Sequence, residues 1–238
     1  RAGKAILVGA APSVRDHIEK IKVLAADSAN VVFAVNDAND FLMENGIIPH
    51  ANVLFEIEQD YKELQRRHHP DITYYIHSFA HPTTFEHFKD KKIVLFHCFS
   101  EQPEHNELLK HFKNKHFMVG GGVCTTLSKT VPVCLYLGWR DFDLFGFDSS
   151  FSEDTHFNGS PYKGSMRIID ITAQVKNHQT GEIKERTFKT LPYLARQADE
   201  FRRSCECHQW MMKLRVHGEG LLPWMHQNTY PHLYEEKK

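Results

Sequence analysis

The stretch AILVGAAPSV, Ala5–Val14, is an apolar run that ends abruptly in small residues, a proline and a serine. A strand that ends on small residues before a helix lets a ligand meet backbone N–H groups and the positive end of the helix dipole. Ser13 is well placed to cap that helix and to donate its hydroxyl. The stretch has neither the G-x-G-x-x-G spacing nor the G-K-[ST] ending of a P-loop. Two interpretations therefore stay open: a ligand-binding turn, or a tight turn before a capped helix.

Outward from this stretch, short apolar runs alternate with helical patterns. The predicted strands are Ala5–Val8, Val31–Val35, Val53–Ile57, Thr73–Ile76, Ile93–Phe96 and Phe142–Phe145. The predicted helices are Val14–Ala26, Ala38–Glu44, Asp60–Arg67, Glu104–Phe112 and Val123–Leu137. Strands that are apolar throughout, with helices between them, are typical of a parallel sheet covered on both faces. The predicted fold class is therefore α/β, a Rossmann-like mostly parallel sheet with helices on both faces.

The character of the sequence changes after Asp148. Residues 149–165 are rich in Ser, Gly, Asn and Asp and predict a long polar loop or lid. The runs IIDITAQVKN and IKERTFKT alternate in polarity and predict a C-terminal β-hairpin. Leu191–Leu214 then predicts one long amphipathic helix, and RVHGEGLLPW predicts a short strand and a turn. Gly218 and Gly220 in this turn either lie near the cleft or form a plain structural corner, and the corner is favoured.

The length of 238 residues and the hydrophobic content of 41% are enough for one large α/β domain with a real core. We expect a single domain over residues 1–238. Its core spans residues 1–148, the loop or lid spans 149–165, and the hairpin and C-terminal helix span 166–238.

The composition disfavours several classes of protein. The formal net charge of -1 gives no overall cationic surface, so nucleic acid is not expected as an obligatory partner. Five scattered cysteines without C-x-x-C spacing indicate a reducing compartment, and the 17 histidines are not grouped at metal-ligand spacings. No apolar run reaches the roughly 20 residues of a membrane span, and the first residues lack a signal-peptide layout. We therefore expect a cytoplasmic protein.

The strongest local signal is VGGGVCTTLSKTVPVCLYLGWRDFDLFGFDSSF. Gly121 and Gly122 precede a helix that carries Thr125 in its first turn, a combination of dipole and hydroxyl that suits an anion. The strand after this helix delivers Asp148 to the carboxyl edge of the sheet. Asp148 is the leading candidate for a metal-bound or substrate-binding carboxylate.

Other polar residues follow the predicted strands, near the edge where open parallel sheets bind ligands. Asn36 ends the second strand, where its amide either contacts a ligand or caps the next helix. Glu56 and Glu58 end the third strand, and one of them could face an acidic cleft. His156, on the polar loop, is a candidate general acid or base because the pKa of imidazole is near neutrality. An ordinary surface histidine is the alternative.

Taken in order, VGAAPS, AVND, NGIIPHANVLFEIE, the glycine-rich segment above and DTHFNG resemble the 6-hydroxymethylpterin diphosphokinase MptE-like family. The resemblance covers residues 4 to about 160. That family is similar to the motility accessory factor glycosyltransferases and, more remotely, to bacterial sialyltransferases with a G-[NG]-G-P-S loop. The resemblance implies a Rossmann-like transferase in which residues 1–148 bind a nucleotide.

Roles for individual residues follow from the resemblance alone. It implies phosphate binding by Gly9, Pro12 and Ser13, nucleotide contact by Asn36, a second small-residue loop at Gly121 and Gly122, and a place beside the transferred group for Asp148 and His156. Two departures stand out. Ala10 and Ala11 occupy positions where the family usually has glycine, and their Cβ atoms narrow the approach to the backbone. Glu56 stands where the family usually has Asp.

Three functions fit this resemblance. In a diphosphokinase, ATP and Mg²⁺ occupy the cleft, Asp148 is the candidate metal ligand, and a pterin hydroxyl attacks the β-phosphorus. In a glycosyltransferase, a nucleotide-activated sugar occupies the same cleft and a base activates an acceptor hydroxyl. In a non-catalytic module, for which the Ala10-Ala11 loop argues, a nucleotide or protein binds without turnover. The expected partners are a nucleotide and a small-molecule or glycan acceptor.

Overall fold

The structure is a computed structural model of the chain, and it describes residues 2–55, 66–99, 107, 110–111, 118–119, 126–151, 166–208 and 211–235. Within these ranges one seven-stranded sheet has the order β11-β8-β1-β2-β3-β4-β5, and every neighbouring pair is parallel. Its strands are β1 (Ala5–Val8), β2 (Val31–Val35), β3 (Ala51–Leu54), β4 (Thr73–His77), β5 (Lys92–Phe96), β8 (Asp141–Phe145) and β11 (Lys213–His217). The predicted Rossmann-like α/β class is confirmed.

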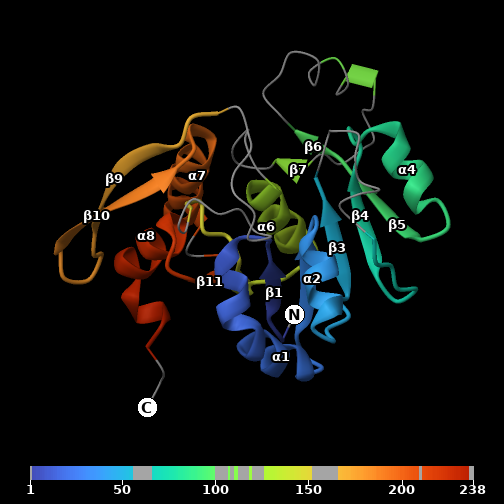
Figure 1. Cartoon of the computed structure of the whole chain (residues 1–238), viewed down its shortest axis with the longest axis horizontal. Coiled ribbons are helices and arrows are strands. Elements are labelled where there is room, and N and C mark those ends of the chain that lie inside the picture. The colour runs from blue at the N-terminus through green and yellow to red at the C-terminus, as the bar shows by residue number, and fades with distance from the viewer. Residues whose placement is uncertain are drawn as a thin grey trace.

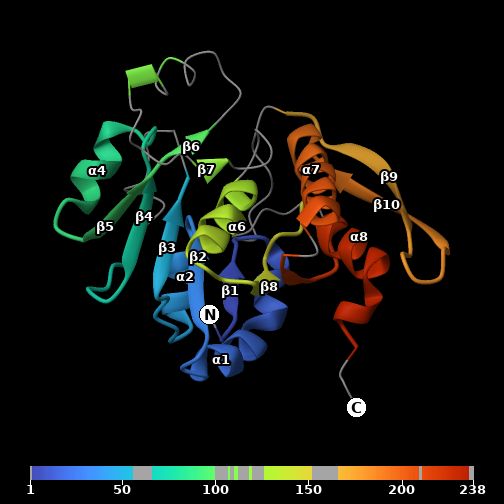
Figure 2. The ribbon, with the colours of Figure 1, turned by 180° about the vertical axis from the view of Figure 1, so that it is seen from behind.

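Helices cover both faces of this sheet, as Figures 1 and 2 show from opposite sides. Successive side chains of a strand point to opposite faces. Ile6 and Val8 therefore pack with α1 and α2, while Ala5 and Leu7 pack with α6. The helical elements are η1 (Pro12–His17), α1 (Ile18–Ala26), α2 (Ala38–Glu44), α4 (Pro82–Phe88), α6 (Thr126–Tyr136), α7 (Pro192–His208), α8 (Leu221–Thr229) and η2 (Pro231–Leu233).

The predicted hairpin is present as β9 (Ile169–Lys176) and β10 (Ile183–Thr190), an antiparallel pair. In both views it lies at the opposite side of the molecule from β5 and α4, next to α7 and α8. A separate two-stranded pair joins β6 (Cys98–Phe99) to β7 (Met118–Val119). Among the described residues, no helix combines the length and apolar character needed to cross a membrane.

Several predicted boundaries were wrong. The strand predicted at Val53–Ile57 is β3, which starts at Ala51 because Ala51 already pairs with β2 and β4. The first predicted helix begins as the 3₁₀ turn η1. The helix predicted over Leu191–Leu214 ends at His208, because Leu214 pairs with β8 as part of β11. Here strand pairing overrides a helical pattern, as tertiary context often does.

Other predictions concern segments that the structure covers only in part. The helices predicted at Asp60–Arg67 and Glu104–Phe112 lie largely outside the described residues, as does most of the loop 149–165. Two helices were missed by the sequence analysis, α4 and α8. α8 follows directly after Gly220 and packs against β11 and β9.

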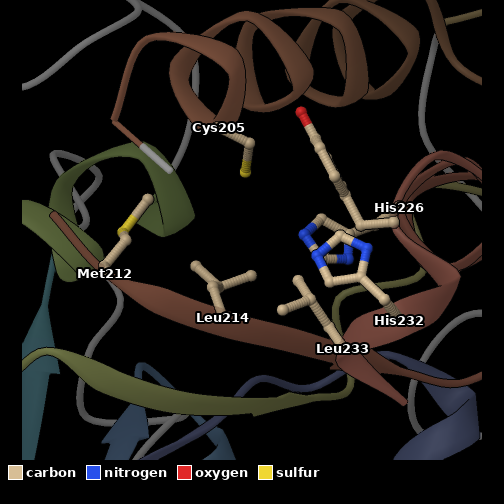
Figure 3. Close-up of a pocket in the computed structure, with 7 residues that line it drawn as sticks. Cys205, Met212, Leu214, His226, His232 and Leu233 are labelled. Atoms are coloured by element: carbon tan, nitrogen blue, oxygen red, sulfur yellow. The ribbon is translucent and has the colours of Figure 1, made fainter. Parts of the chain in front are cut away.

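A small, mostly apolar cavity of about 80 Å³ lies within the C-terminal elements (Figure 3). Its lining residues come from α7, β11, α8 and η2 and their flanks: Cys205, Met212, Leu214, His226, Tyr230, His232 and Leu233. His226 is buried, and its Nδ1 lies 2.7 Å from the Tyr234 hydroxyl. Burial lowers the pKa of His226 to about 3 from its ordinary value of 6.5, so the folded protein holds this imidazole neutral.

We expect stability to decline in mild acid because of His226. Its folded pKa lies below its unfolded pKa, so its contribution is complete above pH 6.5 and is lost as the pH falls toward 3. The free energy of unfolding should fall by about 2 kcal/mol between pH 7.5 and pH 5 from this residue. Urea unfolding across this pH range measures the slope.

The control for this slope uses two neighbouring histidines. His226→Gln should flatten the pH dependence, whereas His232→Gln, at an exposed residue of the same cavity, should leave most of it, because burial is a larger cause of the lowered His226 pKa than the charge of His232. An undiminished acid slope in His226→Gln would show that another group is responsible.

Candidate functional site

The candidate site lies where the order of strands reverses. After β1 the chain builds β2 to β5 on one side of it, and then returns to place β8 and β11 on the other side. In open α/β sheets, ligands bind outside the carboxyl ends of the strands at this switch point. The loops that follow β1, β8 and β11 meet at this point.

The loop after β1 is bonded tightly to the loop after β8. The Gly9 N–H donates to the Phe145 carbonyl at 2.8 Å, and the Ala11 N–H donates to the Gly146 carbonyl at 3.0 Å. A Cβ on Gly9 would lie 2.5 Å from the Gly146 carbonyl oxygen. Gly9 is therefore required for close packing of two backbones, and its N–H is already occupied. The predicted phosphate contact of Gly9 stays a prediction that these bonds do not favour.

Ser13 and Asp148 join the same two loops through their side chains. The Ser13 hydroxyl donates to Asp148 Oδ1 at 2.5 Å, and the Ser13 N–H donates to Asp148 Oδ2 at 3.1 Å. Asp148 is 5% exposed, and its burial raises the pKa of the carboxyl although both bonds from Ser13 act in the opposite direction. The predicted helix cap at Ser13 is wrong: the N-cap position of η1 is Ala11, without a side-chain bond.

Two glycines after β11 complete the surroundings of Asp148. Gly218 has φ +125°, and a Cβ there would lie 2.8 Å from Ser13 Oγ and 3.0 Å from Asp148 Oδ1. A Cβ on Gly220 would lie 2.5 Å from the Asp148 carbonyl oxygen. From the sequence, this G-x-G turn was interpreted as a plain structural corner in preference to a turn near the cleft, and the contacts with Asp148 favour the turn at the site. Only the position of β11 beside β8 brings the turn against Asp148.

An open cavity of about 650 Å³ lies beside this junction. Its volume falls in the range of small-molecule sites. The lining residues come from η1, the segment after β8, β10, the end of β11 with the turn after it, and α8. They are Pro12, Ser13, Asp16, His17, Asp148, Ser150, Phe151, Arg186, Phe188, His217, Gly218, Glu219, Gly220 and Gln227. Three of the predicted site residues, Pro12, Ser13 and Asp148, thus line one cavity.

His217, the last residue of β11, is a lining residue that the sequence analysis missed. Its Nε2 lies 2.7 Å from Asp143 Oδ1, and its ring stacks on Phe145 at a centroid distance of 4.4 Å. Asp143 also accepts bonds from Arg215 Nε at 2.8 Å and from Lys4 Nζ at 3.0 Å. A polar residue at the carboxyl end of a strand was the pattern that could have identified His217. RVHGEG was instead interpreted as a plain structural corner.

The charge of Asp143 determines which nitrogen of His217 carries the proton. Burial opposes ionisation of Asp143, but bonds from His217, Arg215 and Lys4 outweigh it and hold its pKa well below the ordinary value. An ionised carboxylate only accepts hydrogen bonds, so His217 Nε2 must donate. Burial also lowers the pKa of His217, which leaves Nδ1 with a lone pair at neutral pH. The Lys20 ammonium, whose Nζ lies 3.4 Å away, donates to that lone pair.

Asn36 lies apart from this cavity. It has φ +50° at the end of β2, and its Oδ1 accepts the Phe55 N–H at 3.0 Å. Asn52 Nδ2 donates to its carbonyl at 3.2 Å. These bonds connect the ends of β2 and β3, so nucleotide contact by Asn36 stays a prediction. Other predicted site residues lie outside the described residues, namely Glu56, Gly121, Gly122, Thr125 and His156.

The predicted metal role of Asp148 can be compared with the ligands around it in the described part of the chain. They contain no cluster of three or more His, Cys, Asp or Glu side chains suited to an ion. Both carboxylate oxygens of Asp148 already accept bonds from Ser13. Mg²⁺ usually takes one or two carboxylates together with waters and substrate phosphates. The assignment of Asp148 as a metal ligand therefore stays a prediction.

Comparison with solved structures agrees with this architecture. MAf glycosyltransferase from Magnetospirillum magneticum AMB-1 is similar at a TM-score of 0.67 and 17% identity, over 93% of this chain and 33% of that chain. A mammalian sialyltransferase, in complex with Gal-beta-1-3GalNAc-ortho-nitrophenol, aligns at a TM-score of 0.43 and 11% identity, over 92% of this chain and 70% of that one. This chain thus spans about a third of the glycosyltransferase that it matches.

Comparison of sequences gives the family. No curated protein matches the chain. A family model described as 6-hydroxymethylpterin diphosphokinase MptE-like matches residues 2–154, which include β1 to β8 and both loops that Ser13 and Asp148 join. This match covers more than half of the chain and confirms the resemblance stated from the sequence. The chain therefore belongs to the 6-hydroxymethylpterin diphosphokinase MptE-like family.

Proposed function

We propose that the protein is a nucleotide-dependent transferase that moves a diphosphoryl group from ATP to a hydroxyl acceptor. The observation that carries the proposal is the cavity at the switch point between β1 and β8, lined by Ser13, Asp148 and His217. The family description supports diphosphoryl transfer as the reaction. Asp148 has a positioning role in this proposal, because it holds Ser13 and the β1 loop in place.

His217 is the described residue best suited to accept the proton of the acceptor hydroxyl. Its Nδ1 faces the cavity with a lone pair that the Lys20 ammonium contacts at 3.4 Å, so this nitrogen acts as a general base once the acceptor hydroxyl displaces Lys20. In the step, the acceptor oxygen bonds to the β-phosphorus and the bond to the α-phosphate oxygen breaks. AMP leaves with that electron pair, and the proton passes to His217 Nδ1.

The first experiment measures thermal stability with ATP, GTP, CMP, UDP, UDP-sugars and CMP-sialic acid, each with and without Mg²⁺. A ligand at 100 times its Kd should add about 2.7 kcal/mol to the free energy of unfolding. We expect the largest shift with ATP. A comparison with and without Mg²⁺ also tests the metal dependence. The absence of any shift would favour the non-catalytic module and contradict the proposal.

The second experiment follows AMP release from ATP with 6-hydroxymethylpterin as acceptor. His217→Gln should reduce turnover by about 10²- to 10⁴-fold while the Kd for ATP is retained. His17→Gln is the control, because His17 lines the same cavity without an Asp143 bond. Equal losses in the two variants would exclude His217 as the base.

Glycosyl transfer is the second candidate, and one observation favours it. The likeness to the MAf glycosyltransferase covers 93% of this chain, whereas the family model ends at residue 154, before the hairpin. The hairpin contributes Arg186 and Phe188 to the cavity. A stability shift with UDP-sugars or CMP-sialic acid, and none with ATP, would replace diphosphoryl transfer by glycosyl transfer.

A further inference from the structure

We infer that Arg186, on the hairpin, binds the phosphate groups of the nucleotide donor. The inference rests on the proposed function and assigns one part of its recognition to one side chain. The phosphate-binding part of the site would then lie on β10, instead of on the loop after β1 where the family resemblance places it.

The loop after β1 has few N–H groups left for a phosphate. Four of its N–H groups donate within the protein, and Pro12 has none to give. The four donors and their acceptors are Gly9 to Phe145 O, Ala11 to Gly146 O, Ser13 to Asp148 Oδ2, and Val14 to Ala11 O. A phosphate that bound through Gly9, Ala11 or Ser13 N–H would have to displace a bond that joins the β1 loop to the β8 loop.

The charges of the cavity lining also favour Arg186. Its carboxylate-bearing residues are Asp16, Asp148 and Glu219, and an ionised carboxylate repels a phosphate. His17 and His217 give little positive charge at neutral pH, because burial lowers the pKa of both imidazoles. Arg186 is the one Arg or Lys among the described lining residues, and its guanidinium is charged at all relevant pH values.

The guanidinium of Arg186 is available for a ligand. Within the described part of the chain it makes no hydrogen bond or ion pair, and its recorded contact is with the Phe188 ring, 4.9 Å from the centroid. Arg186 is exposed, whereas Phe188 is buried at 7% exposure. A cation above an aromatic face keeps its N–H donors, and the planar fork matches a phosphate.

The strand that carries Arg186 is tied to the residues after β8. The Phe151 N–H donates to the Lys189 carbonyl at 2.9 Å, and the Thr190 hydroxyl donates to the Ser149 carbonyl at 2.7 Å. These bonds fix the end of β10 next to the Asp148 loop. Arg186 therefore faces the cavity from a defined strand and not from a free loop tip.

The test is calorimetric titration with ATP, ADP, AMP and adenosine. Arg186→Gln should weaken ATP and ADP binding by about 10- to 100-fold, the loss expected when a bond to a charged group is removed. Its affinity for adenosine should not change, so the preference for phosphorylated ligands is reduced. Arg186→Lys should recover only part of the affinity, because it keeps the charge without the fork.

Lys184→Gln is the matched control for this titration. Lys184 lies two residues earlier on β10, on the same face, but it bonds Asn228 and does not line the cavity. It should bind all four ligands like the wild type. Unchanged ATP and ADP binding by Arg186→Gln would overturn the inference while the proposed function stands. If the wild type binds none of the four, both are overturned.

Discussion

Asp143→Asn is expected to lower the free energy of unfolding by about 3–5 kcal/mol, the usual cost of removing one partner from a buried ion pair. The Asp143 side chain is 3% exposed and accepts bonds from Lys4, Arg215 and His217. The amide would leave the guanidinium of Arg215 without its main counter-charge in the interior of the protein. Urea unfolding at pH 7 measures the loss.

The control is Asp141→Asn, which removes the other carboxylate bonded to Arg215. The Asp141 side chain is 35% exposed, so its ion pair is screened by solvent and the loss should be smaller, about 1 kcal/mol. Similar losses in the two variants would mean that burial of Asp143 does not matter. Because the folded pKa of Asp143 is depressed, wild-type stability should also fall as the pH drops below 4, and Asp143→Asn should lack this contribution.

Gly146→Ala is expected to destabilise the protein by about 3 kcal/mol or more, since two effects add. Gly146 has φ +71°, a conformation that costs a side chain about 1 kcal/mol. Its Cβ would also lie 2.4 Å from the Gly9 carbonyl oxygen, a contact that the backbone can relieve only by separating the two loops. Thermal unfolding of the variant measures the combined effect.

Gly46→Ala separates the two effects. Gly46 has φ +78°, but a Cβ there meets nothing within 4 Å. Its substitution should cost about 1 kcal/mol, the conformational part alone. If Gly146→Ala cost no more than Gly46→Ala, the close packing of the β1 and β8 loops would not contribute to stability.

Between β1 and β5, local patterns predict all five strands, although they miss α4 and displace the bounds of β3. Val31–Val35 and Ala38–Glu44 were predicted with the bounds that the structure has, because a buried parallel strand is apolar throughout and a helix follows it at once. The short strand predicted from Arg215 is confirmed as part of β11, but the first two residues of β11 and its place in the sheet were not predicted. Lys213 and Leu214 continue a helical pattern, and only pairing with β8 places them in the sheet.

The functional site also has some residues that local sequence patterns predict and others that they do not. Ser13 and Asp148 could be predicted because each follows an apolar run at its carboxyl end. Their bond joins residues 135 positions apart, and no local pattern contains it. The roles of Gly218 and His217 depend on β11 lying beside β8, and that of Arg186 depends on where the hairpin folds back. These are properties of the sheet order and not of neighbouring residues.

The order of strands also has a consequence for synthesis of the protein on the ribosome. β8 lies between the first strand of the sheet and the last, so its two neighbours emerge about 200 residues apart. β1 to β5 can pair early. The outer edge of β8 stays unpaired, and Asp143 lacks its bonds to Arg215 and His217, until β11 is synthesised. The cavity gains His217 and both glycines only at that point. A nascent chain can therefore contain most of the sheet and still lack the site.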